Sequence, residues 1–270
     1  MNIARTGSAF CLLVGLLAVA PGASAATAVP QVGTEPGSSY WAPTQGATWQ
    51  LQYTGRLNTS VPAAIFDIDG FDTSAATVRQ LHASGRKAIC YLSAGTWEDW
   101  RPDASQFSSS VLGTSDGWPG ERWLDIQNLD AIMPIVQARV SMCRAKGFDA
   151  IDFDNVDAYT HDTGFALDAG SQLVYNRLLS DAAHAAGMSV GLKNDIEQVP
   201  QLVSRFDFAI NEQCYQYSEC DLLRPFIAAG KAVLHIEYSV AAWRFCPVTK
   251  SLGFSSIRKR MQLDSWRQAC

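Results

Sequence analysis

The chain has 270 residues, of which 47% are apolar and 17% are charged, and its formal net charge is −5. This length is enough for one large domain or two small ones with a sizeable core, and the apolar share excludes wholesale disorder. Net acidity argues against a general nucleic-acid binder, because phosphate contacts need a basic protein face. The composition therefore indicates a compact acidic protein.

Residues 1–25 have the pattern of a secretory signal peptide. Arg5 precedes an apolar run over residues 9–20, and Ala23-Ser24-Ala25 forms a small-residue cleavage site. This run is too short to span a bilayer, and no later stretch reaches the roughly 18 apolar residues of a membrane helix. We therefore expect a secreted protein without a membrane anchor. Removal of this segment, whose one charged residue is Arg5, changes the net charge to −6.

Six cysteines follow the predicted signal peptide. An even number in an exported chain predicts disulfides, although six cysteines allow 15 pairings. The C-x-x-C and H-x-x-x-H spacings of zinc sites are absent from the sequence, so we expect no metal. Short sequence separation and a need to fix the C-terminus favour three pairs: Cys214 with Cys220, Cys246 with Cys270, and Cys90 with Cys143.

Strand-like and helix-like runs alternate after residues 26–46, a segment rich in Pro, Gly, Ser and Thr that we predict to be flexible. Between several of the strands lie helical patterns that each stop at a glycine, the usual helix terminator. The predicted helices are 73–84, 129–146, 169–186 and 222–229, ending at Gly85, Gly147, Gly187 and Gly230. The predicted strands are 49–54, 63–69, 88–93, 148–154, 189–194, 206–212, 232–238 and a weaker 254–257.

This order of strand, helix, glycine and strand is typical of βα units with a parallel sheet. Eight strands in about 225 residues fit a single-domain (β/α)8 barrel of the TIM type, an α/β fold, over residues 47–270. A doubly wound open sheet is the main alternative. That fold would be favoured by a Gly-rich phosphate loop after the first strand, and neither G-x-G-x-x-G nor G-x-x-x-x-G-K-S/T occurs.

Polar residues gather at the carboxyl ends of the predicted strands, where a barrel places its active site. Several carboxylates that converge in one place usually bind or react with something, because a buried unpaired carboxylate is costly. Two carboxylates suit glycoside hydrolysis, in which one protonates the leaving oxygen and the other attacks or activates water. Asp154 and Glu212 are the natural pair, and the other strand-end candidates are Asp67, Asp69, Tyr91, Asp152, Lys193, Asn194 and Glu237.

Other chemistries match the sequence poorly. The four histidines form no closely spaced pair for zinc hydrolysis, and Ser93 lacks the first glycine of G-x-S-x-G, which leaves a Ser93–His235 triad as a minor alternative. Residues 149–156 resemble the D-G-x-D-x-D-x-E run of chitinase-type barrels. Val156 stands where their proton-donating glutamate would be, so the likeness extends to the fold and not to the chemistry.

Five blocks, in order along the chain, resemble glycoside hydrolase family 114. They are residues 89–103, 123–126, 147–155, 191–194 and 211–214, and the likeness covers about Trp49 to Trp266. The resemblance implies a (β/α)8 barrel with secreted endo-α-1,4-polygalactosaminidase activity and no cofactor.

The family's proposed catalytic carboxylates, an aspartate ending strand four and a glutamate ending strand six, carry over onto Asp154 and Glu212. The resemblance implies a retaining reaction with Asp154 as nucleophile and Glu212 as acid/base, while Asp152 remains an alternative partner. It further implies a cationic amino-sugar polysaccharide as substrate, for which Asp67, Asp69 and Glu237 would bind ammonium groups. Tyr91, Lys193 and Asn194 would line the same cleft.

Three hypotheses follow for the function. The first is an endo-acting glycosidase on α-1,4-linked galactosamine polymers. The second is a related barrel glycosidase on another polysaccharide, and the third is a catalytically silent carbohydrate-binding barrel. In each case we expect a monomer with no nucleic-acid or membrane partner.

Overall fold

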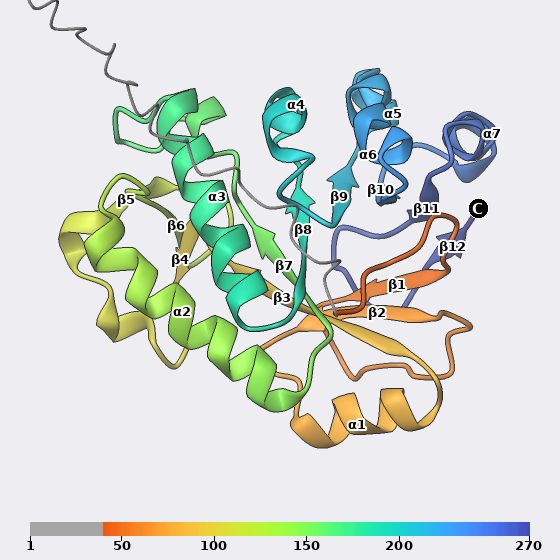
Figure 1. Cartoon of the computed structure of the whole chain (residues 1–270), viewed down its shortest axis with the longest axis horizontal. Coiled ribbons are helices and arrows are strands. Elements are labelled where there is room, and N and C mark those ends of the chain that lie inside the picture. The colour runs from red at the N-terminus through yellow and green to blue at the C-terminus, as the bar shows by residue number, and fades with distance from the viewer. Residues whose placement is uncertain (1–39) are drawn as a thin grey trace, which may run out of the picture. The chain divides into compact units, whose positions relative to one another are not determined.

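The computed structural model describes residues 40–270, and Figure 1 shows a curled parallel sheet with helices on its outside. The predicted signal peptide lies outside the described residues. Eight parallel strands follow each other in chain order, and a short ninth strand pairs antiparallel with the last of them. The α/β barrel prediction is confirmed. The strands are β1 (Trp49–Gln52), β2 (Ile65–Asp69), β3 (Lys87–Ser93), β7 (Ala150–Asp154), β8 (Ser189–Lys193), β9 (Phe208–Glu212), β10 (Ala232–Glu237), β11 (Ser255–Arg258) and β12 (Gln268–Ala269).

Side chains alternate across the sheet and build two separate cores. One face of the strands forms an apolar cluster inside the barrel, which includes Trp49, Ile89 and Phe208. The other face packs against the helices in a larger cluster that includes Phe66 and Phe153. Because successive residues of a strand point to opposite faces, a shift of one position moves a side chain from the barrel interior to the helix layer.

The helices lie largely where their glycine stops predicted. All four predicted stops have a positive φ, between 72° and 92°, which glycine adopts without a Cβ penalty. The predicted helix 222–229 is divided, because Pro225 at the first turn starts a new helix. The longer helices are α1 (Ala75–Ala83), α2 (Leu129–Lys146), α3 (Ala169–Ala185) and α7 (Ala242–Ser251); the shorter ones are α4 (Val199–Leu202), α5 (Cys214–Tyr217) and α6 (Arg224–Ala228).

Two features of this layer differ from expectation. Helix α1 begins at Ala75, two residues later than predicted, because Ser74 caps it with a side chain that accepts a hydrogen bond from the Thr77 amide. Helix α7 was not predicted, because Pro247 interrupts its sequence pattern. Short 3₁₀ turns complete the loops: η1 (Ala104–Gln106), η2 (Ser109–Val111), η3 (Ala158–Thr160), η4 (Ile196–Gln198) and η5 (Cys220–Leu223).

An unpredicted small sheet lies between β3 and α2. Its strands β4 (Thr96–Glu98), β5 (Leu112–Ser115) and β6 (Glu121–Leu124) pair antiparallel in the order β4-β6-β5. It leaves the barrel directly after the carboxyl end of β3. The insertion therefore stands beside the edge of the barrel where an active site is expected.

The C-terminal segment connects the first and last parallel strands. No backbone ladder joins β1 to β11 within residues 40–270. Instead the Trp49 indole donates to the Ser255 carbonyl at 2.8 Å, the Tyr53 amide donates to the Leu263 carbonyl at 3.0 Å, and the Arg267 guanidinium donates to the Trp49 carbonyl. The indole bond joins β1 directly to β11, and the other two contacts attach β1 to the C-terminal segment, whose strand β12 pairs with β11.

All three predicted disulfides are present: Cys90–Cys143, Cys214–Cys220 and Cys246–Cys270. Their distances in sequence are 53, 6 and 24 residues. The last one ties helix α7 to the C-terminal residue, which holds the segment that bridges β1 and β11.

Contacts of the barrel begin before the predicted boundary at residue 47. The Gln45 side-chain amide donates to the carbonyls of Ile227 and Lys231 at 2.8 and 3.2 Å, and Trp41 packs on the inner apolar cluster. Residues 40–46 thus belong to the folded unit, whereas the rest of the predicted flexible segment lies outside the described range. Within that range no helix is long and apolar enough to cross a membrane.

Candidate active site

Charged side chains end three adjacent strands and meet inside the barrel mouth. Asp154 ends β7, Lys193 ends β8 and Glu212 ends β9. Ala150 on β7 and Ile210 on β9 point into the barrel interior. Asp154 lies four residues after Ala150, and Glu212 lies two residues after Ile210. Alternation along each strand therefore turns them inward.

One buried ammonium group contacts both predicted catalytic carboxylates. Lys193 Nζ lies 2.7 Å from Asp154 Oδ1 and 3.3 Å from Glu212 Oε2. Burial by itself would lower the pKa of Lys193, but Asp154 and then Glu212 raise it well above its ordinary value. Lys193 is therefore a permanent cation beneath the two carboxylates.

Asp154 is held as an anion. Burial would raise the pKa of this carboxyl, but the Lys193 ammonium, the Tyr91 hydroxyl and the Asn155 amide together lower it. The Tyr91 hydroxyl donates to Oδ2 at 2.9 Å, and the Asn155 amide donates to Oδ1 at 2.9 Å. An ionised carboxylate with fixed donors is what a glycosidase nucleophile requires.

Glu212 is held more loosely and is more accessible. Its side chain is 24% exposed, compared with 2% for Lys193. The Tyr238 hydroxyl donates to Oε1, and the side-chain amide of Asn194 donates to Oε2 at 3.3 Å. A group that exchanges a proton with substrate must reach the cleft, which Glu212 does.

The chain turns sharply after each of these three strands. Asn155, Asn194, Asp195 and Gln213 have φ values of 61°, 49°, 41° and 66°. Residues other than glycine rarely adopt this left-handed conformation, and such residues concentrate at functional sites. At the first turn, Gly95 lies against the Asn155 carbonyl, where an added Cβ would be only 1.6 Å from the oxygen.

A second pair of carboxylates lies deeper in the barrel. Asp67 and Asp152 are 0% exposed, so the predicted role of Asp67 as a direct ammonium ligand is not supported by its position. Burial, followed by the charge of Asp152, raises the pKa of Asp67 well above its ordinary value. Burial also raises the pKa of Asp152 to about 7. Tyr53 donates to Asp152 at 3.0 Å, so one oxygen of this deeper pair has a fixed donor.

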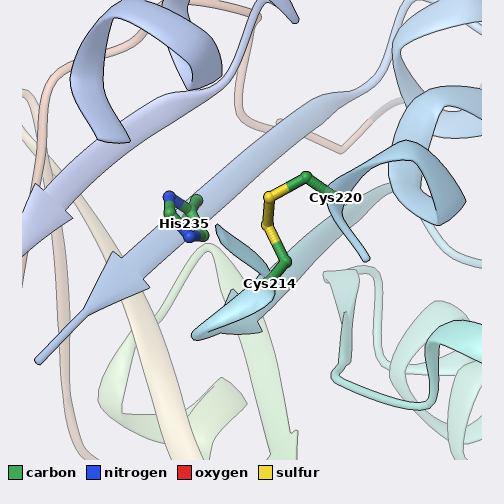
Figure 2. A group of neighbouring side chains, drawn as sticks. All are labelled: Cys214, Cys220 and His235. Atoms are coloured by element: carbon green, nitrogen blue, oxygen red, sulfur yellow. A yellow bond between two sulfur atoms is a disulfide. The ribbon is translucent and has the colours of Figure 1, made fainter. Parts of the chain in front are cut away.

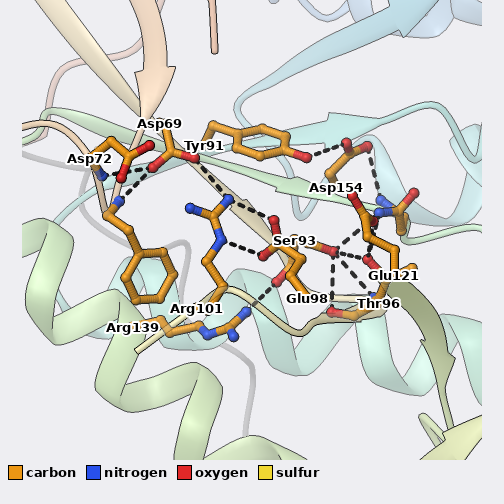
Figure 3. Close-up of polar contacts among 12 residues, drawn as sticks. Asp69, Asp72, Tyr91, Ser93, Thr96, Glu98, Arg101, Glu121, Arg139 and Asp154 are labelled. Atoms are coloured by element: carbon orange, nitrogen blue, oxygen red, sulfur yellow. Dashed lines mark hydrogen bonds and ion pairs between the residues drawn. The ribbon is translucent and has the colours of Figure 1, made fainter. Parts of the chain in front are cut away.

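Asp69 lines the cleft but is committed to an internal ion pair. Its Oδ2 lies 2.8 Å from Arg101 Nη2, and Glu98 holds the same guanidinium at 2.6 and 2.7 Å. Figure 3 shows this group beside Tyr91 and Asp154. Asp69 therefore attaches the inserted sheet to the end of β2, and its carboxylate is engaged in an ion pair that Glu98 shares.

Glu237 faces the helix layer instead of the cleft. It is 0% exposed, accepts from the Tyr215 amide at 2.9 Å, and lies 3.0 Å from His235 Nε2. Its neighbour Tyr238 has the inward position and contacts Glu212. Glu237 was predicted to bind ammonium groups in the cleft, but its side chain points to the opposite face of the strand. The residue one position later, Tyr238, points inward instead.

The Ser93–His235 alternative is not assembled. Ser93 Oγ lies 2.5 Å from Thr96 Oγ1 and accepts from the Asn155 side chain at 3.1 Å. His235 lies on the opposite face of the sheet, with Ser256 and Glu237 as its partners.

A cleft of about 870 Å³ contains the catalytic candidates and continues along the inserted sheet. Trp100 and Trp118, each 51% exposed, stand on its wall and offer ring faces of the kind on which sugars stack. Glu121 on β6 also lines it, and burial together with Asp116 raises its pKa to about 8. Trp100, Trp118 and Glu121 were missed because they lie outside the predicted strands. Tyr53 and Tyr238 lie at the ends of the predicted strands 49–54 and 232–238 but were not among the candidates.

One group of side chains among the described residues has ligand atoms close enough for a metal. Cys214, Cys220 and His235 have such atoms within 4.8 Å of one another (Figure 2). The two sulfurs form a disulfide, and a metal requires thiolates. This group therefore does not fit a metal ion in the oxidised protein.

A (β/α)8 barrel with two partly exposed carboxylates on one cation at the carboxyl ends of its strands has the architecture of a glycoside hydrolase. The model of glycoside hydrolase family GH114 matches residues 32–270, and the chain belongs to this family. The chain is therefore a glycosidase, as the sequence resemblance indicated.

Solved structures agree with this assignment. Ega3 from Aspergillus fumigatus, in complex with galactosamine, is 41% identical over 85% of this chain and 97% of its own, with a TM-score of 0.81. The glycoside hydrolase domain of PelA from Pseudomonas aeruginosa is 14% identical over 82% of this chain and 98% of its own, with a TM-score of 0.65, and shares the fold. None of the curated proteins compared with the sequence matches it.

Proposed function

We propose that the protein is a secreted, endo-acting hydrolase of α-1,4-linked galactosamine polymers that works with retention of configuration. Asp154 attacks the anomeric carbon, and Glu212 protonates the leaving oxygen and then activates water. The observation that carries the proposal is the shared contact of both carboxylates with Lys193.

The spacing of the carboxylates favours retention. Two of their oxygens lie 2.7 and 3.3 Å from one nitrogen, so they are no farther apart than the sum of these distances. Inverting enzymes need about 6.5–9.5 Å between the carboxyl groups to admit a water, whereas retaining enzymes use about 5–5.5 Å. This upper limit on the separation of the two oxygens lies below the inverting range, which supports retention.

The charge of the cleft supports a cationic substrate. Besides Asp154 and Glu212, its lining includes Asp72, Asp116 and Asp157, which have no arginine or lysine partner within 4 Å among residues 40–270, and it contains no lysine. The remaining lining acids contribute less, because Asp69 and Glu98 share Arg101 and burial raises the pKa of Glu121 to about 8. A polymer with free amino groups would be attracted to such a surface. The presence of galactosamine in the Ega3 structure fits the same class of sugar, and three disulfides fit an oxidising, extracellular environment.

The test compares wild type with Asp154→Asn and Glu212→Gln on partly deacetylated galactosaminogalactan. Either change removes a group that acts in the transition state, so we expect the release of reducing ends to fall by about 10² to 10⁴-fold with the melting temperature preserved. Product lengths distinguish endo from exo cleavage, and the anomer first formed, observed by NMR, reports retention.

Two other outcomes would replace the proposal. If wild type ignores this polymer but cuts chitosan or a neutral α-glucan, the protein is a related glycosidase with another substrate. If both substitutions leave polymer binding unchanged and wild type cleaves none of these polymers, the protein is a carbohydrate-binding barrel without activity.

A further inference from the structure

The short helix that follows the catalytic strand β9 cannot support itself. Helix α5 has four residues, and it is flanked by Gln213 at φ 66° and Ser218 at φ 62°. A single helical turn is unstable alone, and a non-glycine residue in the left-handed conformation is strained. Contacts from outside the helix must therefore hold the turn that begins one residue after Glu212.

A buried carboxylate supplies such contacts. Glu237 Oε1 accepts from the Tyr215 amide at 2.9 Å and the Gln216 amide at 3.2 Å, which are unpaired donors at the start of α5. The same oxygen lies 3.0 Å from His235 Nε2, and His235 Nδ1 lies 3.0 Å from Ser256 Oγ. A line of polar contacts thus runs from β11 through β10 to α5.

The Cys214–Cys220 disulfide closes the same turn from its other side. Figure 2 shows it next to His235, on the outer face of the barrel wall. The Asn211 side chain, also on β9, accepts from the Cys214 amide at 3.1 Å. We call the disulfide, His235 and Glu237 together the outer clamp.

The outer clamp cannot touch substrate. His235 and Glu237 are both 0% exposed, and neither lines the cleft that contains Glu212. Burial of a carboxylate is costly unless donors surround it, and here two of its donors are backbone amides of the turn. Its effect on catalysis must pass through the backbone of residues 213–216.

We propose that Glu237, as part of the outer clamp, is a positioning residue that fixes the backbone after Glu212 and so aims this carboxylate at the glycosidic oxygen. The inference rests on the proposed acid/base role of Glu212. A displacement of about 1 Å in a catalytic group can lower the rate by about 10²-fold. Loss of the clamp should therefore lower kcat and leave KM nearly unchanged.

The first experiment compares Glu237→Ala with Glu237→Gln. Alanine removes the acceptor of both amides, and we expect kcat to fall by about tenfold or more with KM within about twofold of wild type. Glutamine retains an acceptor oxygen and should recover most of the loss. A folded Glu237→Ala protein with the kcat of wild type overturns the proposal.

Asp207→Ala is the matched control. Asp207 precedes β9, accepts from the Val190 amide at 2.9 Å and lies 2.8 Å from His184 Nε2. It thus makes the same kinds of contact at the opposite end of the strand, so its loss should lower the melting temperature without changing kcat. An equal fall of kcat in this control would show that Glu237 acts through general stability.

A second measurement needs no substrate and leaves Glu237 unchanged. We expect amide hydrogen exchange of residues 213–218 to be at least tenfold faster after Cys214→Ala with Cys220→Ala, and unchanged after Cys246→Ala with Cys270→Ala. Unchanged exchange in the first protein overturns the clamp. If wild type cleaves no galactosamine polymer, the proposed function fails, while this exchange still decides whether the clamp holds the turn.

Discussion

Two layers of carboxylates in the barrel interior differ in their exposure and in their direct contact with a cation. In the outer layer, Asp154 and Glu212 share the Lys193 ammonium. In the deeper layer, Asp67 and Asp152 have no ion-pair contact within 4 Å among the described residues. Burial raises the pKa of Asp67 and of Asp152, whereas at Asp154 the ammonium and the neighbouring donors outweigh burial and lower the pKa. One lysine thus determines which interior acid is an anion ready for catalysis.

The largest effect is expected from Lys193→Met, which keeps the apolar stem and removes the charge. Without the ammonium, burial raises the pKa of Asp154, so the acidic limb of the kcat/KM profile should move to higher pH. We expect activity at neutral pH to fall by about 10²-fold or more. If the acidic limb of Lys193→Met lies at the same pH as in wild type, Lys193 does not set the pKa of Asp154.

Lys231→Met serves as the control for this lysine. Lys231 donates to the carbonyls of Val203 and Phe206, both at 2.6 Å, at the amino end of β10. Its loss should reduce the free energy of unfolding and leave the pH profile of activity unchanged.

A smaller effect is expected from Asp152→Asn on the pH dependence of stability. The folded protein holds a proton here up to about pH 7, whereas an unfolded aspartate releases it near pH 4. Between these values the native state binds more protons, so wild-type stability should fall as pH rises, by up to about 1.4 kcal/mol per pH unit for this proton.

The asparagine variant should lack this component of the slope. Urea unfolding from pH 4 to 7 would measure it as the difference from wild type. The exposed Asp181→Asn control should run parallel to wild type, and a parallel Asp152→Asn curve would show that the deeper pair holds no extra proton.

The smallest effects are expected from the two tyrosines whose rings lie 3.9 Å apart, one serving each layer. Tyr91→Phe removes the donor to Asp154 and should lower kcat several-fold, while Tyr53→Phe removes the donor to Asp152. Each variant lacks one hydrogen bond to an acidic group, so its free energy of unfolding should fall by about 1 to 3 kcal/mol. Kinetics and melting curves of both proteins would reveal whether activity depends on the outer layer alone; an equal fall of kcat in both would contradict it.

Much of the fold could be predicted because its signals are local. Glycine stops placed α1, α2 and α3 within two residues of their observed bounds, and β-rich runs located all eight parallel strands. The inserted sheet was missed because its short strands are only partly buried and do not form apolar runs. Helix α7 was missed because Pro247 breaks such a pattern.

The candidate site was predicted in part, and strand alternation explains the difference. Asp154 and Glu212 end strands on the inward face, while Glu237 ends a strand on the outward face. All three are acids after an apolar run, and the sequence does not mark which face is inward when both faces of a parallel sheet are buried.

The sequence by itself determined the order of strands and helices and singled out the two carboxylates on strands four and six, because glycine stops, short apolar runs and family-like blocks are local. It left open which of the 15 possible cysteine pairings forms. Only the tertiary structure decided which strand-end acid faces the cleft, that Lys193 contacts both carboxylates, and that Asp69 is already paired with Arg101. These facts depend on contacts between strands and loops far apart in the chain, and on the phase of each strand relative to the barrel interior.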